Sequence, residues 1–188
     1  VSLQPATIHE MFSYWAVLGM LTGRPAQAQQ KILDFKRSTA AFRALTKDRQ
    51  RRKRVYFEAI HSKMKTFAPN SMAVFALECA GGINIAADAD PVRDTNIAYY
   101  GKERILSRAG EIDVYLAQNG AMNRTTVSTI KGEPGFSIIK AVAADQIYIV
   151  DEKIVSRPTT RLLEGIYTIG TYLYPDDFDD EALKILRK

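Results

Sequence analysis

The sequence predicts an α/β fold, a three-layer αβα domain with a mostly parallel sheet, preceded by a long connecting α-helix. Two observations support this. Three strand-like apolar runs, at 55–60, 113–117 and 147–150, are each followed by a polar loop and a helix. Strands separated by helices need crossover connections and are therefore parallel. In addition, one apolar stripe at steps of three and four runs through 26–49, as in a single amphipathic helix.

The composition is that of an ordinary globular protein of one domain, or of one domain with an appendage. The 188 residues are 46% apolar and 25% charged, which excludes collagen-like, low-complexity and disordered chains. One cysteine, Cys79, and two distant histidines, His9 and His61, exclude a disulfide framework and a zinc-built scaffold. The net charge of +5 is compatible with an anionic ligand, with a nucleic acid or with no charged partner, so it does not identify a function.

Two helices are expected before the first strand. Thr7-Ile8-His9-Glu10 forms a capping-box pattern, so a helix should begin there and end at about 19–23. Its apolar stretch, 11–21, is short and has no basic leader, so we interpret it as buried rather than as a targeting or membrane segment. The second helix follows Arg24-Pro25, and its ~25 residues would span ~37 Å. Its apolar stripe consists of Ala28, Ile32, Phe35, Thr39, Phe42 and Leu45.

A run of cations, Arg49-Gln50-Arg51-Arg52-Lys53-Arg54, ends this second helix. A nucleic-acid-binding arm is one interpretation. The other is structural, because cations at a helix C-terminus complement the helix dipole and only Arg54 separates the run from the first strand. We favour the structural interpretation.

Further helices are expected along the rest of the chain. Ser71 caps one at 72–80, which Gly81-Gly82 ends at the position of a left-handed C-cap. The others are expected from about 125 and about 160, and at 102–108 and 180–186. Acidic residues between 176 and 181 precede the last helix, and we interpret them as partners of its dipole rather than as a cation site.

The loops that follow the three strands are the expected ligand site. Ligands of open parallel sheets bind beyond the carboxyl ends of the strands, so the loops at 61–67, 118–124 and 152–157 should lie side by side at one rim. They contain amides, hydroxyls, Met, Phe and cations but few carboxylates. This chemistry favours binding of a large, partly apolar and partly anionic ligand over proton transfer or hydrolysis.

No pattern for catalysis is present. The sequence contains no G-x-S-x-G, H-E-x-x-H, P-loop or G-x-G-x-x-G motif. Cys79 lies on an apolar helix, where packing is expected instead of nucleophilic chemistry. We therefore expect no enzyme activity, no cofactor and no metal site.

Several segments in register resemble one known family. Ala80-Gly81-Gly82-Ile83-Asn84-Ile85-Ala86 resembles the AAGG-N-A segment in the second lobe of periplasmic binding proteins for iron-siderophore, haem and cobalamin uptake. The segments at 100–116, 134–150 and 156–162 are similar to three further units of that lobe, in the same order. Leu18-Gly19-Met20-Leu21-Thr22-Gly23, followed by 26–49, is similar to the start of the helix that joins the two lobes in this helical-backbone, TroA-like class.

The resemblance implies a domain organisation and a function. Residues 1–5 would end the N-terminal lobe, 6–53 would form the helical interlobe connector, and 54–188 would form the C-terminal α/β lobe. The protein would be the substrate-binding component of an ABC importer, capturing an iron-siderophore, haem or cobalamin in an interlobe cleft. It would be periplasmic or an extracytoplasmic lipoprotein and would dock on the importer's permease, with no nucleic-acid partner and no membrane span in this chain.

The resemblance also makes the rim loops the second-lobe wall of that cleft. Glu103 matches the glutamate that is thought to pair with permease arginines, although it could instead only cap a helix start. Glu111-Ile112-Asp113 lacks the family's usual proline. Lys63 and Lys65 stand where glycines are common, and this more cationic wall suits an anionic iron chelate. The expected ligand contacts are His61, Lys63, Phe67, Asn119, Asn123 and Arg157.

Two other classes of function stay open. The first is a doubly wound, transferase-like enzyme that uses the same loops, which turnover or a tightly bound nucleotide would indicate. The second is a nucleic-acid-binding module built on 49–54. Binding that weakens steeply with salt and survives mutation of the rim loops would indicate it.

Overall fold

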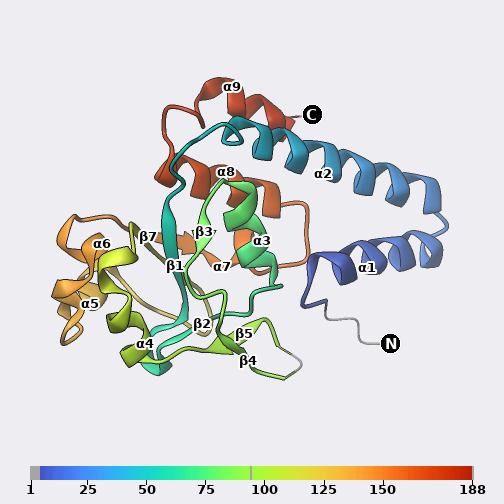
Figure 1. The fold of residues 1–188 in the computed structure, drawn as a ribbon. Coiled ribbons are helices and arrows are strands. Elements are labelled where there is room, and N and C mark those ends of the chain that lie inside the picture. The colour runs from blue at the N-terminus through green and yellow to red at the C-terminus, as the bar shows by residue number, and fades with distance from the viewer. Residues whose placement is uncertain (1–4, 94, 188) are drawn as a thin grey trace.

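A seven-stranded sheet lies between two layers of helices in the computed structural model (Figure 1). The structure describes residues 5–93 and 95–187, so the strand-like residues 1–3 lie outside the described part. The strand order is β4-β5-β2-β1-β6-β7, and β3 also pairs with β1. The strands are β1 (Arg54–Ile60), β2 (Lys65–Phe67), β3 (Ile83–Asn84), β4 (Asp90–Pro91), β5 (Ile97–Tyr99), β6 (Val114–Asn119) and β7 (Ile147–Asp151).

The central strands are parallel and confirm the predicted fold class. β1 pairs in parallel with β3 and with β6, and β6 pairs in parallel with β7. The sequence did not indicate an antiparallel extension of this sheet, in which β2 runs back along β1 and is followed by β5 and β4. The loop expected at 61–67 is therefore a 3-10 turn, η1 (His61–Lys63), and the strand β2. Strands of two or three residues have too little periodicity to be predicted.

The helices follow the predicted order with three differences, the first of which is an unpredicted short helix at Lys140–Ala143. The second helix ends at Leu45 rather than at about 49. The loop expected at 152–157 begins with a short helix, α7, which the side chain of Asp151 caps by accepting from the Lys153 N–H. The α-helices are α1 (Ile8–Leu21), α2 (Pro25–Leu45), α3 (Met72–Cys79), α4 (Lys102–Ser107), α5 (Val127–Gly132), α6 (Lys140–Ala143), α7 (Glu152–Val155), α8 (Leu162–Leu173) and α9 (Asp180–Leu183). The other 3-10 segments are η2 (Ala109–Glu111), η3 (Phe136–Ile138) and η4 (Lys184–Arg187).

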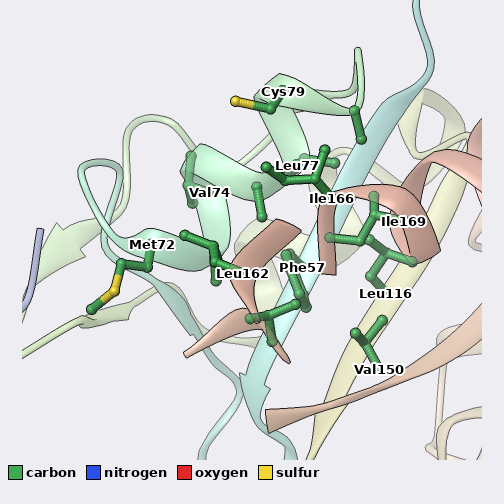
Figure 2. Packing of buried hydrophobic residues seen from close by; sticks show 14 of the residues in the cluster. Phe57, Met72, Val74, Leu77, Cys79, Leu116, Val150, Leu162, Ile166 and Ile169 are labelled. Carbon is green, nitrogen blue, oxygen red and sulfur yellow. The ribbon is translucent and has the colours of Figure 1, made fainter. Parts of the chain in front are cut away.

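The two faces of the sheet pack in separate cores, because successive side chains of a strand point to opposite faces. Phe57, Leu116 and Val150 belong to the core formed with α3, α7 and α8 (Figure 2). Tyr56 and Tyr115 belong to the other core, with α4, α5, α6 and η3. This is the three-layer arrangement that the sequence predicts.

Local signals explain the main helix boundaries. Thr7 Oγ1 accepts from the Glu10 N–H at 3.2 Å, and Ser71 Oγ accepts from the Val74 N–H at 3.2 Å. Gly81 adopts a φ of +86°, and a Cβ at that position would lie 2.4 Å from Thr46 Oγ1. The caps at Thr7 and Ser71 and the glycine stop are therefore present as predicted, except that Glu10 accepts from the Ala6 N–H rather than from the N–H of the cap residue.

α1 and α2 form a hairpin at one side of the sheet domain (Figure 1). At the middle of α2, Phe35 packs edge-to-face on Phe12 and Trp15 of α1. Farther along α2, Phe42 stacks on Phe178, 5.9 Å between ring centroids. The same apolar stripe of α2 thus packs first on α1 and then on the body of the domain.

The cationic run at 49–54 makes contacts within the chain. Arg52 donates to the carbonyl oxygens of Gly81 and Gly82 at 2.8 and 3.0 Å. Arg49, Arg51 and Arg54 form ion pairs with Asp177, Asp113 and Glu111, respectively. The structural interpretation is supported, but its reason changes: the run lies beyond the end of α2, so it acts through these contacts rather than through the helix dipole.

Candidate functional site

The carboxyl ends of β1, β6 and β7 meet at one edge of the sheet, where their three loops contact one another. The His61 N–H donates to Asn123 Oδ1 at 3.0 Å, which joins the first loop to the second. Ser156 Oγ donates to Gln118 Oε1 at 2.9 Å, and this bond joins the second to the third. The three loops therefore lie side by side, and we call this edge the rim.

A hollow of about 640 Å³ opens at the rim. Its walls come from the strand ends, from the β4–β5 connection and from the start of the described chain. Arg157 lines it, whereas the other five predicted ligand contacts are outside its lining. The lining residues are Pro5, Ala6, Ile60, Lys65, Val92, Thr95, Asn96, Ile97, Gln118, Met122, Glu152, Ser156, Arg157 and Pro158.

Arg157 is held in place by an ion pair with Glu152, 2.5 Å between Nη2 and Oε1. Glu152 is only 8% exposed, and its second carboxylate oxygen accepts from the Ala121 N–H at 2.8 Å. A Cβ at Gly120 would lie 2.0 Å from this oxygen, so the glycine makes room for the carboxylate. The contacts of Glu152 thus join the second and third loops and position a guanidinium at the hollow.

The rest of the hollow combines a second cation with apolar surface. Lys65 Nζ lies 4.1 Å from the centroid of the Tyr99 ring, a cation–π contact. Gln118 is buried and already hydrogen-bonded, since its Nε2 donates to the Ala59 carbonyl oxygen at 3.1 Å. Met122 is 61% exposed. Two cations beside aliphatic side chains suit a ligand that is partly apolar and carries negative charge.

The predicted contacts on the first two loops have different surroundings. Lys63 and Asn119 are exposed at the rim. Phe67 is fully buried and packs edge-to-face on Phe57, 4.8 Å between centroids. Asn123 is 4% exposed and has its side chain turned inward, so in this structure Phe67 and Asn123 support the rim from below. Contact with a ligand remains a prediction for the exposed side chains.

A buried carboxylate, Glu58, lies beneath these loops and was not among the predicted site residues. It accepts from Tyr115 Oη at 2.5 Å and from Asn123 Nδ2 at 3.2 Å, and it lies 2.8 Å from His61 Nδ1. Burial, followed by the charge of Glu58, raises the pKa of Tyr115 well above its usual value, so the phenol is a neutral donor. The signal in the sequence was a glutamate in the otherwise apolar run of β1.

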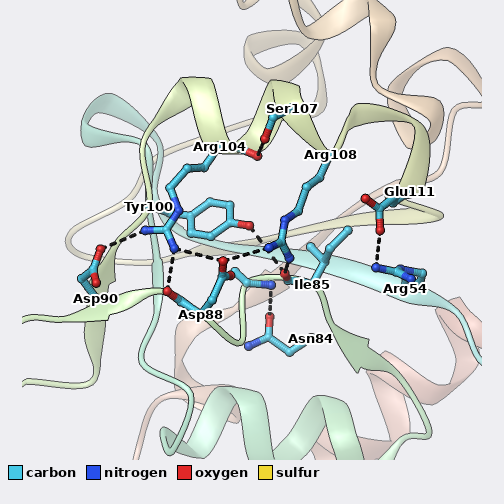
Figure 3. A network of polar contacts seen from close by, with 11 residues as sticks. Arg54, Asn84, Ile85, Asp88, Asp90, Tyr100, Arg104, Ser107, Arg108 and Glu111 are labelled. Carbon is cyan, nitrogen blue, oxygen red and sulfur yellow. Dashed lines mark hydrogen bonds and ion pairs between the residues drawn. The ribbon is translucent and has the colours of Figure 1, made fainter.

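Glu103 is exposed in the first turn of α4 and has no hydrogen bond or ion pair with another described residue. Arg104 of the same helix pairs with Asp88 and Asp90, and Arg108, at the C-cap of the helix, also pairs with Asp88 (Figure 3). These ion pairs hold α4 against the chain between β3 and β4. They leave Glu103 accessible.

Within the described residues, no group of three or more His, Cys, Asp or Glu side chains is placed to hold a metal ion. None of the described helices combines the length and the apolar character that crossing a membrane requires. Burial raises the pKa of the Cys79 thiol to about 12, which agrees with the packing role expected for it.

Comparisons with known proteins agree on one fold. A family model described as periplasmic binding protein matches residues 4–154. No curated protein sequence matches the chain significantly. A solved structure of a possible iron-binding (periplasmic solute-binding) protein from Staphylococcus epidermidis is 24% identical, with a TM-score of 0.76 over 93% of this chain and 66% of that one.

Two other solved structures are similar. A protein of an ABC-type Fe3+-hydroxamate transport system from Saccharomonospora viridis is 20% identical, with a TM-score of 0.70 over 90% of this chain and 57% of that one. IsdE of S. aureus, solved with haem, is 16% identical, with a TM-score of 0.72 over 90% of this chain and 66% of that one. The chain thus spans less than two thirds of each of these proteins, and at such identities the likeness concerns the fold.

Proposed function

Because this chain belongs to the periplasmic binding protein family, we propose that it is the C-terminal part of the substrate-binding component of an ABC importer. In this proposal, residues 1–5 end a first lobe, 6–53 are the interlobe connector and 54–188 are the second lobe. The protein captures its substrate without catalysis, in the periplasm or, as a lipoprotein, outside the cytoplasmic membrane. Exposed Glu103 is the proposed contact with the permease.

The proposed substrate is an anionic iron-siderophore or a related metal chelate, such as haem or a corrinoid. The observation that carries this choice is the rim hollow, where Lys65 and Arg157, the latter paired with Glu152, lie among apolar and neutral polar side chains. A chelate of this kind presents a broad apolar surface with carboxylate or phenolate oxygens, which match these walls and cations. Exposed Lys63 and Asn119 are proposed to contact the ligand at the same rim, together with His61, whose side chain is 12% exposed. Solved structures of similar fold include a protein of an Fe3+-hydroxamate transport system and a haem complex.

Binding is testable through Trp15, the chain's single tryptophan. Its Nε1–H donates to the Pro158 carbonyl oxygen at 3.0 Å, next to Arg157, so its fluorescence should report on the hollow. We expect saturable quenching by one or more of ferric siderophores, haemin and cobalamin. Absence of saturable quenching by all three, or detectable turnover of a nucleotide-activated substrate, would overturn the proposal.

Replacing Arg157 by glutamine is expected to weaken chelate binding about tenfold or more, since a charge-assisted hydrogen bond is worth ~1.5–3 kcal/mol. The matched control is Arg161→Gln, which removes the same charge four positions away. Arg161 pairs with Glu164 and is outside the lining of the hollow. The Trp15 titration gives the dissociation constant of each variant. Equal affinities for Arg157→Gln and Arg161→Gln would exclude Arg157 as a ligand contact.

A further inference from the structure

The buried Glu58 is not explained by ligand contact, because its side chain is fully shielded from solvent. Its three partners come from three places: Tyr115 is on β6, Asn123 is on the loop after β6, and His61 begins the loop after β1. A buried carboxylate is costly unless hydrogen-bonded donors surround it. Here the donors are side chains that set the position of the rim loops.

His61 connects this carboxylate to a second one. Its Nε2 lies 3.6 Å from Glu133 Oε2, at the C-terminal end of α5, and its ring meets the edge of Phe136 on η3 at 6.4 Å. Lys102 of α4 pairs with Glu133 at 2.6 Å. The imidazole therefore lies between carboxylates of β1 and of the α5–η3 segment, 12% exposed.

Protonation of His61 changes the charge balance of this cluster. The charged groups that face the imidazole are Glu58, Glu133 and, through Glu133, Lys102, while Tyr56 and Tyr115 are neutral phenols whose pKa burial raises. With a neutral imidazole the cluster keeps one net negative charge, and with an imidazolium it keeps none. A partly buried cluster is more stable without net charge.

We propose that Glu58 is the positioning residue of the rim, and that it forms with protonated His61 a pH-dependent clasp that ties β1 to the 119–124 loop and to the α5–η3 segment. When His61 loses its proton, its ring keeps a single N–H, which can donate to Glu58 or to Glu133 but not to both. The clasp then loosens, and the segments that it joins move more freely. Ligand capture should then be stronger at lower pH. This last consequence rests on the proposed function, whereas the clasp itself does not.

The direction of the pH effect follows from the contacts of His61. Its hydrogen bond to Glu58, followed by the charges of Glu58 and Glu133, raises the pKa of His61 above the usual 6.5, although burial opposes this. A raised pKa means that the folded state binds the proton more tightly than the unfolded state. The stabilisation is therefore complete below about pH 6.5 and is lost as the pH rises through the raised pKa.

An NMR titration of the two histidine side chains tests the clasp. His61→Gln removes one of the two signals and so assigns the other to His9. We expect the midpoint of His61 to lie above 6.5 and to move to lower pH in Glu58→Gln, which keeps the shape and an acceptor oxygen. If Glu58→Gln fails to fold, Glu133→Gln, at a less buried position, replaces it in the test. This variant should also lower the midpoint of His61. The matched control, Glu111→Gln on the far side of the domain, should leave it unchanged.

Hydrogen exchange supplies the second readout, because a merely structural Glu58 would not make the rim depend on pH. The protection factor of the His61 N–H, which donates to Asn123, should fall as the pH rises through the midpoint and should be low throughout in Glu58→Gln. A His61 midpoint at or below 6.5, or a protection factor independent of pH, overturns the clasp. If ferric siderophores, haemin and cobalamin all fail to bind at pH 6 and pH 8, the proposed function fails, and the titration still decides the clasp.

Discussion

Gly165→Ala should lower the free energy of unfolding by about 3 kcal/mol, near the upper end of the usual cost of overpacking a core. Gly165 lies in α8, and a Cβ there would be 2.1 Å from the carbonyl oxygen of Ile154 and 3.1 Å from Val155 Cγ1. The oxygen belongs to the backbone of α7, and Val155 is fully buried, so neither neighbour has space to retreat. The two helices must move apart. Urea unfolding followed by circular dichroism measures the change.

The same substitution at Gly132 is the control for this prediction. Gly132 lies in α5, and a Cβ there would have no heavy atom within 4 Å. Gly132→Ala should therefore be neutral or stabilise the protein by about 0.5–1 kcal/mol, because alanine restricts the unfolded chain more than glycine does. Similar unfolding midpoints for the two variants would contradict the close α7–α8 contact.

Since α7 leads directly to Ser156 and Arg157, Gly165→Ala should also weaken chelate binding at the rim.

Phe42→Ala should cost about 4 kcal/mol, the usual loss for removing a large buried aromatic side chain. Phe42 is fully buried where α2 meets the body of the domain, and its ring stacks on Phe178 with an interplanar angle of 11°. Without this ring, the second half of α2 loses its main aromatic contact with the segment before α9. We expect the α1–α2 hairpin to detach before the sheet unfolds.

Two spectroscopic signals separate these events during urea unfolding. Trp15 reports on the hairpin, whereas far-ultraviolet circular dichroism reports on the whole chain. In Phe42→Ala the fluorescence transition should occur at lower urea than the dichroism transition. The control, Leu33→Ala, removes an apolar side chain that is 39% exposed on the same helix and should change stability by less than about 1 kcal/mol. Equal losses in both variants would show that Phe42 has no special role.

Much of the fold could be predicted because its signals act between residues that are close in the chain. Ser71 caps α3 through the N–H of Val74, only three residues later. The continuous apolar runs of β1, β6 and β7 are typical of parallel strands that are covered on both faces. The short strands β2, β4 and β5 had no such signal, because they are held by pairing with one another and with β1.

The sequence could locate the candidate site at one edge of the sheet, but it could not show which side chains of that edge are exposed. The predicted parallel pairing and the carboxyl-end rule place the three loops at one edge, and Arg157 does line the hollow there. Phe67 is buried because it lies on β2, an internal strand that pairs with both β1 and β5, and its ring packs on Phe57. This pairing depends on the partner strands rather than on the local sequence.

By itself, the sequence determined the three long parallel strands, the order of the longer helices, most of their ends and the edge of the sheet where a ligand is expected, because caps, glycines and apolar periodicity act over a few residues. Only the tertiary structure decided that Glu58 meets Tyr115 and Asn123, which are 57 and 65 residues away. A buried carboxylate needs several donors at once, and those donors are brought together by the packing of the whole sheet.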